Sequence, residues 1–269
     1  MKIKCVYMKL SKDEYWNLLL DVLPEFKKLN HFVQDNIIKK EQGIPYLKIK
    51  NINFLHDYLL TVSERFQLIM LSTHKLLEIE KRKKFSQSFS QIVDFEDTFE
   101  ATYHFSSFVS FIMSFLNSLA WTIKIVYDLN IKRNDIEFRQ SKKLIDYLKD
   151  IDQELYKYIL SSFDWIDELI RFRDVLHHRQ QIEFLLVMDD YSHDNRIYIP
   201  SDPELFIWKY TNNRFETDLE FGSRIDEIKK RKGDLIQPLI PFIDEKMKKL
   251  IELTNLICKC LHHKLTSTY

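Results

Sequence analysis

A long stretch of this sequence contains neither of the residues that most often interrupt helices. No glycine occurs within residues 44–221, and no proline occurs within residues 46–199. Proline removes a backbone donor and clashes with the preceding turn, and glycine favours turns and bulges, so turn-rich folds use both residues often. The sequence therefore predicts long helices and argues against a β fold.

The few glycines also exclude several classes of nucleotide-binding protein. The chain of 269 residues has only three glycines, Gly43, Gly222 and Gly233. P-loop, Rossmann and kinase-type phosphate loops each need several closely spaced glycines, which these three cannot supply. Lysine plus arginine, 40, balances aspartate plus glutamate, 40. Any binding of nucleic acid must therefore come from a local patch and not from bulk charge.

The cysteines and the first residues indicate a reducing environment. Cys5, Cys258 and Cys260 are too few and too clustered for a disulfide framework, and Met1–Tyr7 has no signal-peptide pattern. We therefore expect a cytoplasmic protein. Cys258 and His262 share a helical face, but Cys260 points elsewhere and no second pair completes a tetrahedral shell. We expect neither a metal site nor a cofactor.

One uncharged segment has nearly the length of a membrane span. The 19 residues Phe105–Ile123 include no formally charged side chain. Serines recur along one helical face, at Ser107, Ser110, Ser114 and Ser118. The opposite face is apolar, with Phe108, Phe111, Ile112, Phe115 and Leu119. Serine allows neighbouring backbones to approach closely, and hydroxyl groups in lipid would need partners. The pattern predicts the central helix of a bundle and no membrane partner.

Helical periodicity predicts the other elements of a mainly α fold. Apolar positions recur at helical spacing in 53–84, in 94–129, from Ser141 to Ile159, from Ser162 or Asp164 to Val175, and in 238–264. Two extended runs, Ile182–Val187 and Ile197–Ile199, predict a β-hairpin, because β-branched and aromatic residues flank a polar turn. Residues 200–232 are expected to be irregular.

These elements predict four parts of the chain. Residues 1–50 form an N-terminal helical extension that packs on the body, and residues 51–181 form a helical bundle core. Residues 182–232 hold the β-hairpin and an irregular insertion, and residues 233–269 hold a C-terminal helix that completes the bundle. The predicted architecture is an up-and-down helical bundle with a small β-hairpin insertion.

One cluster of charged residues lies near the end of the fourth predicted helix. Arg173, Asp174 and His178 form the pattern Arg-polar-x-x-x-His. A second register pairs Arg171 with His177. Arg171, Asp174 and His178 share one helical face, whereas Arg173 and His178 lie about 140° apart if the helix stays regular.

This motif resembles the signature of the HEPN superfamily (higher eukaryotes and prokaryotes nucleotide-binding), in which Arg is followed by four to six residues and then His. The residue after the arginine is commonly Asn, Asp or His in that family, and Asp174 matches it. The resemblance includes the order of the helices, with two long helices, a shorter pair and the motif late in the last of these. It spans residues 50–265 and implies a HEPN-like bundle.

The resemblance implies a metal-independent endoribonuclease with Arg173 and His178 as catalytic residues and Asp174 in support. Histidine titrates near neutrality and serves as base or acid, and arginine presents several donors to a phosphate. Asp174 would either orient the imidazole or hold the arginine. Arg171 and His177 are the candidates in the shifted register. The implied product carries a 2′,3′-cyclic phosphate.

Related proteins commonly form homodimers whose cleft combines two copies of the motif, which would bring the diverging side chains together. They often serve as toxins or antiviral defence effectors, sometimes held in check by a nucleotidyltransferase-type antitoxin. The alternative is a catalytically inactive HEPN-like module that dimerises, or binds RNA or a nucleotide, in a larger complex. A helical scaffold unrelated to this family is the third interpretation.

Overall fold

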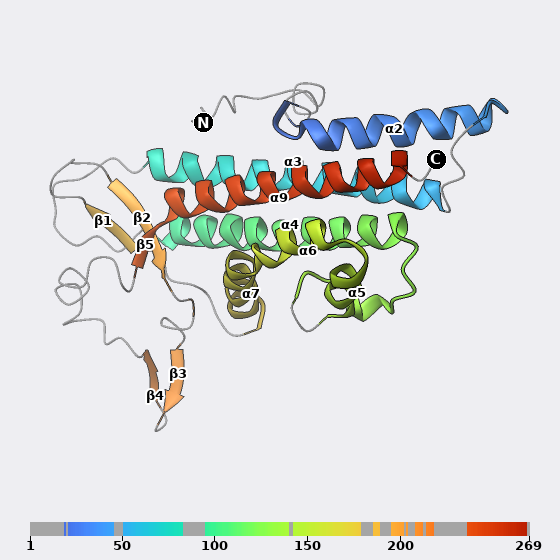
Figure 1. Cartoon of the computed structure of the whole chain (residues 1–269). Helices are drawn as coiled ribbons and strands as arrows, with labels where there is room; N and C mark the ends of the chain where they lie inside the picture. Colours follow the sequence, from blue (N-terminus) through green and yellow to red (C-terminus); the bar gives the residue numbers. More distant parts are fainter. Residues whose placement is uncertain are drawn as a thin grey trace. The chain divides into compact units, whose positions relative to one another are not determined.

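Helices dominate the structure, which confirms the mainly α fold. The computed structural model describes residues 19, 21–45, 51–82, 95–139, 142–178, 185–188, 195–201, 203, 208–211, 214–217 and 236–267. The helices are α2 (Pro24–Glu41), α3 (Ile52–Arg82), α4 (Phe95–Val126), α5 (Lys143–Ile151), α6 (Gln153–Leu160), α7 (Phe163–His178) and α9 (Leu239–Ser267), drawn in Figure 1. The predicted helices over 53–84, 94–129 and 238–264 correspond to α3, α4 and α9.

The contacts of the chain divide it into two compact units. Unit 1 comprises residues 1–69, 111–167 and 247–269, and unit 2 comprises residues 70–110 and 168–246. Helices α3, α4, α7 and α9 each contribute residues to both units. Each unit thus combines segments that are far apart in the sequence. The predicted division into four consecutive parts is of a different kind and stays a prediction.

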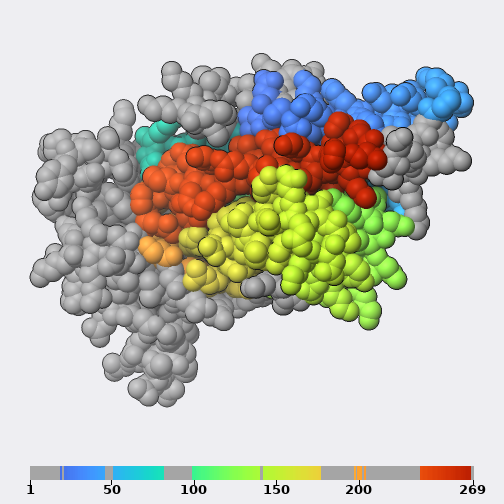
Figure 2. Space-filling model, in the orientation of Figure 1, coloured from blue at the N-terminus to red at the C-terminus, as the bar shows by residue number. Residues whose placement is uncertain are grey.

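In unit 1, helix α2 packs on α9 through polar and aromatic contacts. The backbone N–H of Glu25 donates to Asn255 Oδ1 at 3.2 Å, and Asn255 Nδ2 donates to the carbonyl of Val22 at 3.3 Å. The ring of Phe32 meets His262 edge to face at 5.3 Å between centroids. Figure 2 shows α9 exposed along the surface of this unit, between α2 and α6.

The segment predicted as one helix from Ser141 to Ile159 is two helices, and that prediction was wrong. Asp152 separates α5 from α6 with φ −149°, and its Oδ1 accepts the backbone N–H of Leu155 at 2.9 Å. An aspartate that caps a new helix competes with continuation of the old one. The Tyr127 hydroxyl also donates to Asp152 Oδ2, which ties this corner to the end of α4.

In unit 2, three aromatic rings form the centre of the core. Phe105 of α4 lies 5.4 Å from Phe172 of α7 and 6.0 Å from Phe242 of α9, and the last two are 5.3 Å apart, all between ring centroids. Each of the three side chains is at most 2% exposed. Edge-to-face and tilted rings add to the burial of their apolar area. Aromatic packing therefore joins α7 to α4 and α9.

Helix α4 is the candidate membrane span of the sequence. Among the described helices, the stretch Phe99–Val126 is long and apolar enough to cross a bilayer, and 56% of its most apolar window is buried inside the protein. Its predicted apolar face includes Phe108, Ile112, Phe115 and Leu119, each 0% exposed. Four of the five residues of the predicted apolar face are thus buried, and the fifth, Phe111, is half-buried.

The predicted hairpin is present, and the small β part is larger than expected. β1 (Leu185–Met188) pairs antiparallel with β2 (Asn195–Pro200), and β5 (Ile236–Pro238) joins the other edge of β2. β3 (Trp208–Thr211) and β4 (Arg214–Thr217) form a second antiparallel pair. The expectation that residues 200–232 are irregular was therefore wrong for Trp208–Thr211 and Arg214–Thr217, and most of the other residues of this segment lie outside the described part of the chain. Two residues separate β3 and β4, the length of the commonest hairpin connection.

Candidate functional site

Helix α7 carries the predicted motif and is held by a buried apolar face. Its start follows Ser162, whose hydroxyl donates to the carbonyl of Tyr158 at 3.0 Å, and Asp164 lies inside the helix. The buried residues of this helix include Trp165, Ile166, Leu169, Phe172 and Val175. Their spacing of three and four residues fixes the rotation of α7 about its axis. That rotation leaves Arg171 exposed and Arg173 and Asp174 half-buried.

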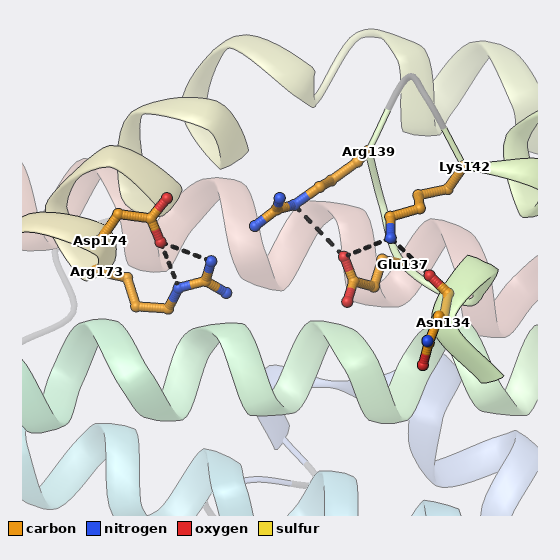
Figure 3. Close-up of polar contacts among 6 residues, drawn as sticks. All are labelled: Asn134, Glu137, Arg139, Lys142, Arg173 and Asp174. Carbon is orange, nitrogen blue, oxygen red and sulfur yellow. Dashed lines mark hydrogen bonds and ion pairs between the residues drawn. The ribbon is translucent and has the colours of Figure 1, made fainter. Parts of the chain in front are cut away.

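The structure brings Arg173 and Asp174 together as an ion pair. Asp174 Oδ1 accepts from Arg173 Nη2 at 2.7 Å and from Arg173 Nε at 3.0 Å (Figure 3). The Arg173 side chain is 28% exposed and that of Asp174 is 45% exposed. Both guanidinium contacts converge on one carboxylate oxygen, so the aspartate fixes the orientation of the guanidinium. These contacts are those of the predicted role in which Asp174 holds the arginine; the role of orienting the imidazole of His178 stays a prediction.

The helix stays regular through the histidines of the motif. Helix α7 ends at His178, so the backbones of His177 and His178 are helical, and their side chains lie outside the described part of the structure. Five residues along a regular helix turn the side-chain direction by about 140°. The backbone of one chain therefore directs Arg173 and His178 to different sides of α7.

The shifted register places Arg171 on the surface. Arg171 is exposed, and it precedes Asp174 by three residues on the same helical face. Asp174 forms an ion pair with Arg173, the arginine of the first register. The geometry thus links Asp174 to the first register, and His177 remains the candidate partner of Arg171.

A buried ion pair next to the motif was missed by the sequence prediction. Lys246 Nζ of α9 lies 2.5 Å from Glu168 Oε2 of α7 and 3.2 Å from Glu245 Oε1. The Lys246 side chain is only 3% exposed, and its ammonium lies 4.7 Å from the centroid of the Phe242 ring. The signal in the sequence was a lysine four residues after Phe242 and four before Leu250, in the apolar phase of the helix.

His104 on α4 is held by its neighbours in the helix. Its Nε2 atom lies 3.9 Å from Glu100 Oε1, and its ring meets Tyr103 edge to face at 5.2 Å between centroids. Its side chain is 17% exposed. These contacts agree with a packing histidine.

The C-terminal cysteines are poor candidates for a metal site. Cys258 is buried and Cys260 is half-buried. Burial raises the pKa of the Cys258 thiol well above its usual range, and burial, with the charges of Asp152 and Glu154, raises the pKa of Cys260 to about 11. The thiolate is the form that binds metal, so both environments disfavour it. Within the described residues, no group of three or more His, Cys, Asp or Glu side chains could hold a metal ion.

Comparisons with known proteins assign no family to the chain. No family model matches it, and neither curated proteins nor solved structures gave a match. Any function of the chain is therefore inferred from the residues of α7, from their contacts, and from the resemblance of the motif and of the helix order.

Proposed function

We propose that this protein is a metal-independent endoribonuclease of the HEPN type, with Arg173 and His178 as its catalytic residues. The observation that carries the proposal is the Arg173–Asp174 pair, whose contacts to one carboxylate oxygen are 2.7 and 3.0 Å long. A half-exposed guanidinium held by a neighbouring carboxylate is suited to meet a phosphate without reorientation. Asp174 is a positioning residue in this scheme.

The direction of the two side chains on α7 supports a site composed of two chains. Because α7 remains helical through His178, the backbone positions 173 and 178 of one chain lie about 140° apart around the helix axis. A second copy related by two-fold symmetry presents the same surface and supplies the missing partner. We therefore propose a homodimer in which Arg173 of one protomer works with His178 of the other.

The chemistry assigned to these residues needs no cofactor. The imidazole of His178 takes the proton of the 2′-hydroxyl, whose oxygen attacks the adjacent phosphorus, and a protonated group delivers a proton to the departing 5′-oxygen. Arg173 stabilises the charge that develops on the phosphoryl oxygens. The products are a 2′,3′-cyclic phosphate and a free 5′-hydroxyl. This step consumes no water. The bond from phosphorus to the 2′-oxygen replaces the bond to the 5′-oxygen, and the proton taken by His178 is matched by the proton delivered to the leaving group.

The biological setting follows from the resemblance alone. We propose a cytoplasmic toxin or antiviral defence effector that cleaves RNA, held in check by a nucleotidyltransferase-type antitoxin or another partner of a defence system. The alternative is an inactive HEPN-like module that dimerises or binds RNA or a nucleotide. The ion pair itself favours that alternative in one respect, since Asp174 neutralises part of the charge of Arg173.

The test is cleavage of labelled single-stranded RNA and transfer RNA by the purified protein in excess EDTA. We expect wild-type protein to cleave, with cyclic phosphate ends, and Arg173→Ala and His178→Ala to be inactive while circular dichroism shows an unchanged fold. Lys248→Ala, on a side chain that is 75% exposed on α9, serves as the matched control. Loss of activity in Arg171→Ala and His177→Ala instead would select the shifted register.

A mixing experiment tests the composite site. Arg173→Ala and His178→Ala chains are co-expressed with different tags, and the mixed dimers are purified. If each site combines two protomers, a mixed dimer retains one intact site of two and recovers about half of the wild-type activity. Mixed dimers as inactive as either parent would contradict the composite site. RNA binding without cleavage by a folded, dimeric wild type would favour the inactive module.

A further inference from the structure

A dense group of cations lies in the segment between α4 and α5, within unit 1. The segment 132–143 includes five cationic residues, Lys132, Arg133, Arg139, Lys142 and Lys143, and two acidic ones, Asp135 and Glu137. The chain as a whole has a net charge of zero. The excess of positive charge is therefore local, which is the pattern that a neutral protein needs in order to bind a polyanion.

Contacts within the segment hold some of these cations in place and leave others at the surface. Glu137 Oε2 lies 3.4 Å from Arg139 Nε and 3.6 Å from Lys142 Nζ, and Lys142 Nζ donates to the carbonyl of Asn134 at 2.6 Å (Figure 3). Glu137 and Asn134 thus connect the two ends of the loop. Lys132 and Arg133 are exposed, and neither makes an ion pair among the described residues.

A stacked pair of aromatic rings borders this segment. Tyr58 of α3 and Trp121 of α4 are parallel to within 5°, with 5.3 Å between ring centroids. Both residues are half-buried, and Lys124 Nζ lies 5.3 Å from the centroid of the Trp121 ring. Burial raises the pKa of the Tyr58 phenol, and the nearby charge of Arg133 opposes this rise. The charge of Arg133 therefore acts on the Tyr58 ring.

The surroundings distinguish between three polyanionic partners. A membrane surface requires apolar anchors beside the cations, but Ile136 and Phe138 of this segment are 2% and 3% exposed, and Ile131, which precedes it, is 7% exposed. An acidic peptide has carboxylates and no regular supply of planar rings. Single-stranded nucleic acid combines phosphates with planar bases, and surfaces that bind it combine cations with aromatic side chains.

We propose that Lys124, Lys132, Arg133, Tyr58 and Trp121 form a binding surface for single-stranded RNA, which we call the unit 1 surface. Lys132 and Arg133 bind phosphates of the backbone. Lys124 leaves the face of Trp121 for a third phosphate when a base stacks on that ring. The choice of RNA rests on the proposed function, whereas the binding itself is independent of catalysis.

The first experiment measures binding of an oligonucleotide that cannot be cleaved. The wild-type chain is titrated into a fluorescein-labelled, 2′-O-methylated single-stranded 12-mer, and fluorescence anisotropy gives Kd between 50 and 250 mM salt. Losing two phosphate contacts in the double variant Lys132→Gln/Arg133→Gln reduces the slope of log Kd against log salt by about 1.4 and raises Kd at least about tenfold. The control, Lys28→Gln/Lys248→Gln, removes two other exposed cations of unit 1 and leaves both quantities unchanged.

The second experiment tests stacking on Trp121. RNA binding quenches tryptophan fluorescence in the wild type, and Trp121→Phe removes most of the quenching and weakens binding less than about tenfold, since a base stack is worth about 1–3 kcal/mol and phenylalanine retains part of it. Circular dichroism establishes that each variant is folded.

The outcomes separate this proposal from the proposed function. An equal Kd and salt slope for Lys132→Gln/Arg133→Gln and wild type overturns the unit 1 surface, even if the enzyme cleaves RNA. Tighter binding to vesicles of phosphatidylserine than to the oligonucleotide, or unchanged quenching in Trp121→Phe, overturns the RNA assignment. Binding as expected, without any cleavage of ordinary RNA, supports the surface and contradicts the nuclease.

Discussion

Two ion pairs on α7 begin only five residues apart and differ in almost every physical respect. Glu168 reaches across to Lys246 of α9, whose side chain is 3% exposed, beside the ring of Phe242. Arg173 pairs with the next residue of its own helix, Asp174, and both side chains are partly exposed. One pair joins two helices in the core of unit 2, and the other joins neighbours at the surface of that unit.

The difference separates charges that hold the fold from charges that are available for chemistry. A lysine at the centre of an apolar helix face has lost its water, so removal of Glu168 leaves this buried charge with only the more exposed carboxylate of Glu245 as its ion-pair partner. A solvated pair of adjacent residues contributes little to folding stability, because water competes for both groups. Substitutions at the two pairs should therefore affect different measurements.

The largest effect is expected from breaking the buried pair. Glu168→Gln leaves Lys246 charged and poorly compensated, and we expect the free energy of unfolding to fall by about 3–5 kcal/mol in urea titrations. The double variant Glu168→Leu/Lys246→Met replaces both charges by apolar groups and should recover most of this loss. Equal destabilisation by the single and double variants would show that the pair is not coupled.

Arg173→Ala should have the opposite profile. Removing a cation that meets the transition-state phosphate lowers kcat about 10²–10³-fold. The free energy of unfolding should change by less than about 1 kcal/mol, because the pair with Asp174 is partly solvated. Kinetics of cleavage and urea titrations on the same preparation measure both quantities. A loss of stability as large as that of Glu168→Gln would place Arg173 among the residues that hold the fold.

Asp174→Asn tests the positioning role and should be milder. The amide keeps the shape of the side chain but loses the charge that orients the guanidinium. An exposed pair is worth up to about 1 kcal/mol, so kcat should fall by less than about tenfold. The kcat of Asp174→Ala should fall further than that of Asp174→Asn. Equal kcat values for wild type and both variants would remove Asp174 from the mechanism.

The smallest effect is expected for the chemical reactivity of Cys260 on α9, whose thiol is partly buried. Burial raises the pKa of Cys260 to about 11 from the ordinary 9.0, so the thiol is protonated at pH 8. In a Cys5→Ser background, its reaction with Ellman's reagent should be slow at pH 8 and accelerate toward pH 11. The folded state holds this proton more tightly, so its contribution to stability is present below pH 9 and is lost as the pH rises through 11. Fast reaction at pH 8 would contradict the burial of this thiol.

Local patterns in the sequence predicted the elements that depend on local causes. The long helices α3 and α4 follow from apolar periodicity without breakers, and the β1–β2 hairpin from a change of period. The break at Asp152 escaped prediction because Ile151 and Leu155 continue the helical spacing across it. Strand β5, Ile236–Pro238, is too short to have a period at all.

The sequence likewise predicted those contacts of the candidate site that join neighbouring residues, and it did not predict those that join distant ones. Arg173 and Asp174 are adjacent in the sequence, so the sequence alone predicted an ion pair between them as one of two possible roles of Asp174. Glu168 and Lys246 are separated by 78 residues, and only the packing of α7 against α9 brings them together. A buried charge in an apolar phase is visible in a sequence, whereas the identity of its distant partner is not.

The pairing of β5 with β2 has a consequence for how this chain tolerates change in length. Pro200, at the end of β2, is the register partner of Ile236, at the start of β5, and α9 begins directly after β5 at Leu239. The residues that flank the segment 201–235 therefore lie side by side in the sheet. Replacement of the segment 201–235 by a short turn, or by a different module, should therefore leave α9 in place. Grafting of a new recognition element is least costly at this point of the molecule.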